Sequence, residues 1–307
     1  MLKVFYISSE INDHFGVNQV LSSLKKFFNK NLLVYDTGNL NKFINSKYDL
    51  IHIHGCWKVK LFVYFIIAKL KNIKIVISPH GMLDPYSLKQ KKIFKVFFWY
   101  IFQKYIFTLS DQIIVNSKNE KKNISQLINF KKIIIIPHGI ELGPLNFKKK
   151  NKFMKFIFFS RIHPSKNLIT LINLWTQNKY FDNLELSIYG EISDHKYFQK
   201  IKKKIVKFEN INYRKPLYKN KIKILSNYDI FIFPSKSENF GLVILEALAA
   251  GLYLILNRNL PWHHLKDKKY ASLINFNKNQ LISAIKYIKK KINKIRQKSY
   301  KKSTNSY

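Results

Sequence analysis

The sequence predicts two α/β domains, each built on a doubly wound parallel sheet. Three observations support this prediction. The length of 307 residues suits two domains of about 150 residues each. Short β-branched or aliphatic runs alternate with helix-length connections, as in parallel βαβ units. The alternation restarts after a lysine-rich segment, FKKKNKFMK (147–155), and a hydrophobic share of 47% is enough to form a core in each domain.

The expected strands are short runs of β-branched, aliphatic or aromatic residues. Those of the first domain are VFYI (4–7), LLVY (32–35), LIHIH (50–54), IKIVIS (73–78), QIIVNS (112–117) and KIIIIP (132–137). Those of the second are FIFFS (156–160), LELSIYG (184–190), INY (211–213), DIFIFPS (229–235) and LYLILN (252–257). In open parallel sheets, ligands bind beyond the carboxyl ends of the strands, so the residues that follow these runs are candidates for a site.

The composition between the two sets of strands predicts where one domain ends. Gly143, Pro144 and a run of lysines coincide between Leu142 and Met154, which indicates a linker. We therefore expect a first domain over residues 1–145, a second over 152–290, and a polar basic tail over 291–307.

The charge balance is strongly basic. Lys and Arg total 55 against 17 Asp and Glu, a net charge of +38, which favours an anionic partner or surface. Only four of the cations are Arg, the side chain that base and phosphate recognition prefers, so nucleic acid is an unlikely partner. Lys, Asn, Ile, Phe and Tyr are abundant along the whole chain, and compositional drift is the alternative explanation of the excess.

Cysteine usage and hydropathy indicate a compartment. The single cysteine, Cys56, excludes an intrachain disulfide and is typical of a reducing environment. The opening MLKVFYIS is a strand pattern without the features of a signal peptide. The longest apolar stretches, 61–68 and 242–256, fall short of the roughly 18 uninterrupted residues of a membrane span. We expect a cytoplasmic protein, either free or peripheral on the inner face of the cytoplasmic membrane.

The stretch PSKSENFGLVILEALAAG (234–251) combines a strand end, a polar turn and a helix that Gly251 ends. The unpaired amides and partial positive charge of a helix start stabilise a phosphate. Glu238 falls in the turn and Glu246 inside the apolar helix. A buried carboxylate without partners costs several kcal/mol, so a ribose hydroxyl pair is a sensible partner for Glu246. The alternative is that Glu246 caps a neighbouring backbone or pairs with a lysine.

A second polar stretch, SRIHPSKN (160–167), places two cations at a strand-to-helix turn. Arg161 ends the strand, and Lys166 follows near the start of the next helix. Two converging cations suit a diphosphate, because a departing phosphate develops negative charge. A surface ion pair is the alternative for Arg161.

These stretches together resemble the retaining glycosyltransferases of family 4, with the glycosyltransferase group 1 domain and the GT-B fold, over roughly Phe5 to Ile285. The motifs are ENFGLVILE (238–246), SRIHPSK (160–166), IPHGIEL (136–142), YGE (189–191) and SPHGML (78–83). The resemblance implies two Rossmann-like domains facing across a cleft. The first would lie on the acceptor side, and the second would bind a nucleotide-diphosphate sugar.

The resemblance also implies roles for individual residues. In the catalytic set, Arg161 and Lys166 would hold the diphosphate. Glu238 would contact the transferred sugar, and His80 would lie beside the reacting centre. In the donor-binding set, Glu246 would hold the ribose. The other members would approach the sugar and phosphates through their backbone; they are Gly16, Gly190, Phe240, Gly241 and Leu242.

The implied reaction retains the anomeric configuration and needs no protein nucleophile, metal ion or other cofactor. No Asp-x-Asp metal signature occurs in the sequence. The expected acceptor is a growing cell-surface glycan or glycolipid, as in lipopolysaccharide, capsule or exopolysaccharide. Phe15 stands where many relatives have a glycine, and the chain after Trp262 is short. The alternative function is therefore a catalytically weak GT-B protein that acts as a basic membrane- or nucleic-acid-binding module.

Two further patterns each leave two readings open. His52, His54 and Cys56 alternate along one strand, which suits either a metal or the lining of a cleft. The segment LKQKKIFKVFFWYIFQKYIF (88–107) interleaves lysines with aromatic residues. As a helix it would lie in an anionic membrane interface, or it would pack in the core with its lysines in solvent.

Overall fold

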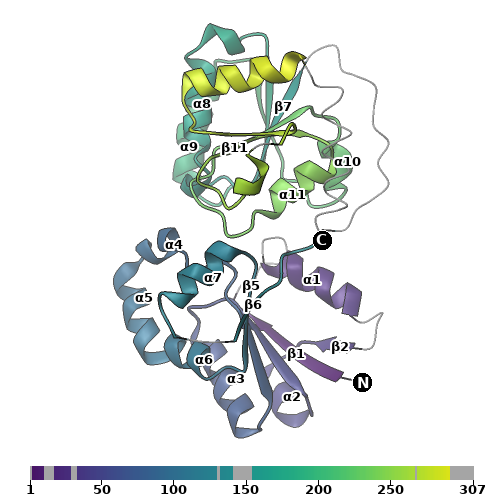
Figure 1. Cartoon of the computed structure of the whole chain (residues 1–307), viewed down its shortest axis with the longest axis vertical. Helices are drawn as coiled ribbons and strands as arrows, with labels where there is room; N and C mark the ends of the chain where they lie inside the picture. Colours follow the sequence, from purple (N-terminus) through teal and green to yellow (C-terminus); the bar gives the residue numbers. More distant parts are fainter. Residues whose placement is uncertain are drawn as a thin grey trace. The chain divides into compact units, whose positions relative to one another are not determined.

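The computed structural model describes residues 2–9, 17–28, 33–129, 132–140, 154–266 and 268–290. The chain forms two compact units, Met1–His138 and Gly139–Tyr307 (Figure 1). The linker expected between Leu142 and Met154 lies, except for Met154, outside the described residues, as does the tail expected over 291–307.

The first unit contains a parallel sheet of six strands in the order β2-β1-β3-β4-β5-β6. The chain passes from β1 to β2 on one side and then to β3 on the other, so the topological switch point lies between β1 and β3. The strands are β1 (Leu2–Ser8), β2 (Leu33–Asp36), β3 (Leu50–His54), β4 (Lys74–Ser78), β5 (Gln112–Val115) and β6 (Ile133–Ile135).

Helices connect these strands. They are α1 (Val17–Phe28), α2 (Leu40–Asn45), α3 (Val59–Leu70), α4 (Pro85–Lys89), α5 (Lys92–Phe98), the π-helical turn η1 (Trp99–Gln103), α6 (Lys104–Thr108) and α7 (Lys118–Ser125). The isoleucines of the central strands, Ile51, Ile53, Ile75 and Ile77, are fully buried. Continuous apolar strands of this kind are typical of parallel sheets covered on both faces.

The second unit contains another parallel six-stranded sheet, in the order β12-β11-β10-β7-β8-β9. Its strands are β7 (Lys155–Phe159), β8 (Glu185–Tyr189), β9 (Ile211–Arg214), β10 (Ile230–Phe233), β11 (Tyr253–Asn257) and β12 (Ala271–Ile274). The connecting helices are η2 (Pro164–Lys166), α8 (Leu168–Thr176), η3 (Lys179–Phe181), α9 (His195–Ile205), α10 (Lys221–Leu225), α11 (Leu242–Ala249) and η4 (His263–Leu265). A further helix over residues 278–290 follows β12. Buried aromatic rings, among them Phe156, Trp175 and Phe233, fill the core.

The structure confirms the predicted fold class and all eleven predicted strands, with ends shifted by a few residues. The sequence prediction missed β12 because its four residues, Ala271–Ile274, carry little of the β-branched pattern. Within the described part of the chain, no helix is both long and apolar enough to cross a bilayer.

Candidate functional site

The second sheet has its topological switch point between β7 and β10. The two strands are neighbours, and the chain leaves β7 for β8 on the opposite side. Loops that follow such a pair of strands separate and leave room for a ligand beyond their carboxyl ends. The loop after β7 carries Arg161 and Lys166, and the loop after β10 carries Glu238. Three of the predicted site residues therefore belong to the same edge of one sheet.

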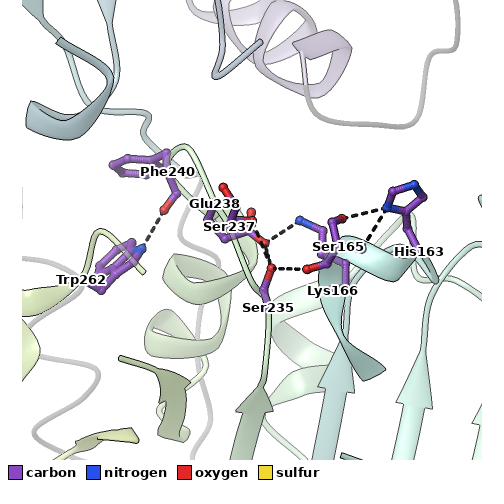
Figure 2. Close-up of polar contacts among 8 residues, drawn as sticks. All are labelled: His163, Ser165, Lys166, Ser235, Ser237, Glu238, Phe240 and Trp262. Atoms are coloured by element: carbon purple, nitrogen blue, oxygen red, sulfur yellow. Dashed lines mark hydrogen bonds and ion pairs between the residues drawn. The ribbon is translucent and has the colours of Figure 1, made fainter. Parts of the chain in front are cut away.

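Lys166 and Glu238 form an ion pair across these two loops (Figure 2). The Nζ of Lys166 lies 2.5 Å from Oε1 of Glu238. The hydroxyl of Ser235 donates to the same carboxylate oxygen over 2.8 Å. The two charged side chains are only 11% and 10% exposed. Because the pair is largely removed from water, each charge depends on the other for its stability.

Backbone contacts between the loops hold this pair in place. The amide of Lys236 donates to the carbonyl of Ser165 over 2.9 Å, and the Ser235 hydroxyl oxygen lies 3.3 Å from the same carbonyl. At the start of η2, Nδ1 of His163 accepts from the Ser165 amide over 3.2 Å (Figure 2). Burial, and then the positive charge of Arg161, lower the pKa of His163. The turn that carries Lys166 is therefore capped by an imidazole held in its neutral form.

Arg161 differs from Lys166 because its side chain is exposed. No hydrogen bond or ion pair joins its guanidinium to another residue in the described part of the chain. The surface ion pair considered from the sequence is therefore absent among the described residues. Its planar fork of donors is available to an anion at the edge of the sheet.

The start of α11 lies beside Glu238. Gly241 precedes the helix with a φ of +81°, and a Cβ at this position would lie 3.6 Å from Cγ of Glu238. The indole of Trp262 donates to the carbonyl of Phe240 over 2.7 Å (Figure 2). No side chain caps the helix, which begins at Leu242. Its first amides and partial positive charge therefore lie at the same edge as the ion pair.

Glu246 lies further along α11 and is only 4% exposed. Its Oε1 lies 3.1 Å from Nζ of Lys221 in α10, and the side chains are 5% and 18% exposed. The structure thus contains the lysine pair that the sequence left open for this carboxylate. A contact between Glu246 and a ribose stays a prediction.

Gly190 follows β8 and allows a close approach between two chain segments. A Cβ at Gly190 would lie 1.8 Å from the carbonyl oxygen of Ser160. The hydroxyl of Tyr213 donates to the Gly190 carbonyl over 2.8 Å. The sequence placed Gly190 in the donor-binding set. The structure gives it a packing role at the ends of β7 and β8. Gly16, which belongs to the same predicted set, lies outside the described residues.

In the first unit, His80 belongs to a group of polar side chains at the ends of β3, β4 and β5. Its Nε2 lies 2.8 Å from Nδ1 of His54, and its Nδ1 lies 3.4 Å from the side-chain nitrogen of Asn116. An amide nitrogen only donates, so Nδ1 of His80 accepts and the proton of the neutral ring resides on Nε2. Burial lowers the pKa of both His54 and His80 well below the ordinary value, so both rings are neutral at pH 7.

Glu120 positions this group of side chains. It was not among the site residues predicted from the sequence. It is 1% exposed in α7, and its two oxygens accept from the amides of Gly81, over 2.6 Å, and Asn116, over 2.8 Å. The turn after β4 and the end of β5 are thereby joined through one carboxylate. The sequence does carry a signal, because Ser117 and Glu120 have capping-box spacing and the Ser117 hydroxyl accepts from the Glu120 amide. That signal predicts a helix start and not the carboxylate contacts.

The pattern of His52, His54 and Cys56 does not form a metal site within the part of the chain that the structure describes. His52 Nε2 lies 2.8 Å from the hydroxyl of Ser78, and His54 contacts His80. Cys56 is buried, and its amide donates to the sulfur of Met82. Both histidine rings therefore have a protein partner.

The fold defines a class of protein, the α/β proteins of the GT-B type, and the family models that match the chain make it a sugar-transferring enzyme of the hexosyltransferase kind. The family model described as "Glycosyl transferases group 1" matches residues 144–303, slightly more than half of the chain. A second model, "Glycosyltransferase Family 4", matches residues 13–143. The chain belongs to the glycosyl transferases group 1 family, and the resemblance inferred from the motifs is confirmed.

Several curated proteins are similar in sequence. An "Uncharacterized 41.2 kDa protein in cps region" of Klebsiella pneumoniae is 28% identical over 277 residues, which are 83% of this chain and 71% of that protein. A probable sucrose-phosphate synthase of Thermosipho melanesiensis is 32% identical over 57% of this chain and 44% of its own length. The UDP-N-acetylglucosamine–peptide N-acetylglucosaminyltransferase GtfA subunit of Streptococcus agalactiae is 28% identical over 51% of this chain and 33% of its own. The alignments thus span less than half of the last two proteins.

Solved structures show the same fold. The sucrose-phosphate synthase of Thermosynechococcus elongatus superposes with a TM-score of 0.75 and 15% identity, covering 99% of this chain and 94% of that one. Anabaena Alr3699/HepE in complex with UDP-glucose also gives a TM-score of 0.75 and 15% identity, covering 99% and 95%. These likenesses confirm the GT-B fold class.

Proposed function

We propose that this enzyme transfers a hexose from a uridine-diphosphate sugar to a growing cell-surface glycan, with retention of configuration and without a metal ion. One observation carries the proposal. Lys166, Glu238 and the start of α11 meet at the switch point of the second sheet. Such a position binds nucleotide ligands in open α/β sheets. The choice of uridine is supported by HepE, whose structure contains UDP-glucose, and by pneumococcal GtfA, whose structure contains UDP and GlcNAc.

The proposed donor binds with its diphosphate between the α11 start and the cations of the β7 loop. Arg161, which is exposed, donates two parallel hydrogen bonds to two oxygens of a phosphate. Lys166 is held by Glu238, so it reaches a phosphate from a fixed position and loses little side-chain freedom on binding. Each charge-assisted hydrogen bond contributes about 1.5–3 kcal/mol. These contacts strengthen as the leaving phosphate gains charge, which lowers the barrier for departure.

The proposed reaction forms the new bond on the face from which the diphosphate leaves. The bond from the anomeric carbon to the phosphate oxygen breaks, the acceptor oxygen bonds to that carbon, and the acceptor proton passes to the departing phosphate. No carboxylate has to act as nucleophile, and Glu238, whose Oε1 is held by Lys166 and Ser235, binds the sugar hydroxyls through Oε2. Two cations and a helix start supply the positive charge that a metal ion supplies in other enzymes.

The proposed acceptor belongs to a surface glycan such as lipopolysaccharide, capsule or exopolysaccharide, in free or lipid-linked form. The similarity to a protein in the cps region of Klebsiella pneumoniae supports this choice. We propose that His80 lies beside the reacting centre. The chain from Glu120 through Asn116 holds its ring, with the proton on Nε2.

Ligand binding tests the donor proposal most directly. In a thermal-shift series with UDP, GDP and ADP, we expect UDP alone to stabilise the second unit. A nucleotide at 100 times its dissociation constant adds about 2.7 kcal/mol to the free energy of unfolding. Incubation with UDP-glucose and with UDP-N-acetylglucosamine, followed by NMR of the released or transferred sugar, reads the configuration. Transfer that persists in a chelator supports the metal-independent reaction.

The alternative, a catalytically weak protein that binds membranes or nucleic acid, makes the opposite prediction. No stabilisation by any of the three nucleotides, together with tight and salt-sensitive DNA binding, would favour it. Stabilisation by GDP or ADP and not by UDP would retain the transferase and overturn the choice of uridine.

A further inference from the structure

The outer face of the helices that follow β4 is apolar. The helical stretch from α5 through η1 to α6 exposes Ile93 by 89%, Phe97 by 62% and Tyr100 by 63%. Further exposed apolar side chains on the same stretch and at its end are Phe94, Val96, Ile101, Tyr105 and Leu109. They recur every three to four residues, so they form one stripe along the helices. We name this stripe, with the three residues above, the α5–α6 face.

The opposite side of the same stretch forms part of the core. Phe98, Gln103, Ile106 and Phe107 are buried, and Phe102 packs against Phe62 of α3 with ring centroids 5.1 Å apart. The stretch is thus apolar on both sides, and only one side has a partner within the described residues. Monomeric soluble proteins rarely leave a contiguous apolar surface of this kind in water. The α5–α6 face therefore indicates an interaction surface.

The charged residues of the helical stretch itself are all positive. From Pro85 to Ser110 the sequence has five lysines and no acidic residue. Lys89, Lys91, Lys92 and Lys104 are exposed. The fifth, Lys95, does not reach solvent freely, because it donates to the Ser87 carbonyl and lies over the ring of Trp57. α4, α5 and α6 lie together along one side of the first unit (Figure 1).

We propose that the α5–α6 face docks the enzyme on an anionic lipid bilayer. Aromatic and aliphatic side chains enter the boundary between head groups and acyl chains, and the exposed lysines contact lipid phosphates. A second copy of the chain fits the face poorly, since a symmetric contact would bring the lysines of both copies together. The proposal does not depend on the donor proposed above, because the face lies outside the second unit.

Co-sedimentation of the full chain with vesicles tests the proposal. The vesicles are phosphatidylcholine alone or a mixture with phosphatidylglycerol. We expect binding to the mixed vesicles only, weakened by salt. Substitution of Lys89, Lys92 and Lys104 by Gln is expected to lower the partition constant about 100-fold, since each lysine near the surface contributes about fivefold. The triple variant I93Q/F97Q/Y100Q is expected to lower it at least about tenfold.

The matched controls change the same kind of residue elsewhere. Lys202, Lys203 and Lys204 of α9 are exposed, and their joint substitution by Gln removes the same charge. Val206 is 74% exposed, and Val206→Gln removes an exposed apolar side chain. Both controls are expected to stay within about threefold of the parent chain. If the α9 variant loses as much binding as the α4–α6 lysine variant, the attraction is diffuse and the proposal is wrong.

A fluorescent label gives a second readout. The natural Cys56 is 2% exposed, so Phe97→Cys and Val206→Cys can each be labelled selectively with a polarity-sensitive dye. The dye at position 97 is expected to brighten and shift to the blue with mixed vesicles, and the dye at position 206 to stay unchanged. A shift at position 97 that depends on protein concentration without vesicles would identify a second copy as the occupant and overturn the proposal. Transfer to a soluble acceptor, measured on the same variants, separates failure of docking from failure of the donor proposal.

Discussion

Lys166 and Glu238 are 72 residues apart in the sequence, and their charged atoms lie 2.5 Å apart in the second unit. The contact exists because β7 and β10 are neighbours in the sheet. Ser235, two residues after the end of β10, donates to the same carboxylate. The cation proposed for a phosphate and the acid proposed for a sugar hydroxyl are thus fixed relative to each other in the chain without a donor. Preorganisation of this kind contributes to catalysis because no charge has to be moved into place during the reaction.

Lys166→Met tests the ion pair. It is expected to lower the free energy of unfolding by about 3 kcal/mol, because a carboxylate that is 10% exposed loses its partner. The double variant K166M/E238Q removes both charges and is expected to recover more than half of that loss. Urea denaturation of the second unit gives the values. A double variant less stable than Lys166→Met would contradict the pairing.

Arg161→Ala tests the phosphate contact. Because Arg161 is exposed and has no partner among the described residues, the unfolding free energy is expected to change by no more than about 0.5 kcal/mol. Turnover with the donor is expected to fall about 100-fold. Arg214→Ala is the matched control, since Arg214 is also exposed and ends the outer strand β9. Equal turnover in the two variants would remove Arg161 from the mechanism.

Gly190→Ala tests the close approach between β7 and β8. The new Cβ would lie 1.8 Å from a backbone carbonyl that cannot rotate away, so a loss of about 3 kcal/mol in stability is expected. Gly139→Ala is the control, because a Cβ there meets no atom of the described residues within 4 Å. Thermal unfolding distinguishes them, and a Gly190→Ala variant as stable as the control would show that the loops separate easily.

Glu120 is expected to act as a positioning residue for His80. Glu120→Gln keeps the shape and one acceptor but loses the charge that receives two amides. Stability of the first unit is expected to fall by about 2 kcal/mol. kcat is expected to fall with the KM for the donor unchanged, since the proposed donor contacts lie in the second unit. A purely structural role would leave kcat of the folded variant at the parent value.

The buried histidines predict a loss of stability in acid. Burial lowers the pKa of His52 to about 3, while the unfolded chain titrates near 6.5. Between pH 6.5 and pH 3, His52 is protonated in the unfolded chain and neutral in the folded one. Its contribution to the free energy of unfolding is therefore present above pH 6.5 and is lost as the pH falls towards 3. On the order of 2 kcal/mol is lost from this group between pH 7 and pH 5. Denaturation at pH 7 and at pH 5 gives the free energy of unfolding at each pH. The difference between the two free energies should be smaller in His52→Gln than in the parent chain.

Most of the fold could be predicted from local pattern. Eleven of the twelve strands appear in the sequence as short apolar runs, because strands buried on both faces need continuous apolar residues. The same reasoning placed Arg161, Lys166 and Glu238 at strand ends. The helix end predicted at Gly251, which has a positive φ, was also a local signal.

The partners of the polar residues could not be predicted in this way. That Glu246 pairs with Lys221, and that Glu120 joins two backbone segments, depends on which elements become neighbours. The helices after β4 show the same limit, because the stretch carries apolar residues all round. Only packing against α3 decided that Phe102 is covered and Tyr100 is left in solvent.

The sequence by itself determined the fold class, the strands and the family, because apolar periodicity and glycine positions act over a few residues. The tertiary structure alone decided which charges meet and which apolar face stays uncovered. Those contacts join residues far apart in the chain, and the order of strands in the two sheets, β2-β1-β3-β4-β5-β6 and β12-β11-β10-β7-β8-β9, sets them. Strand order results from the packing of whole helices and strands, which no short segment encodes.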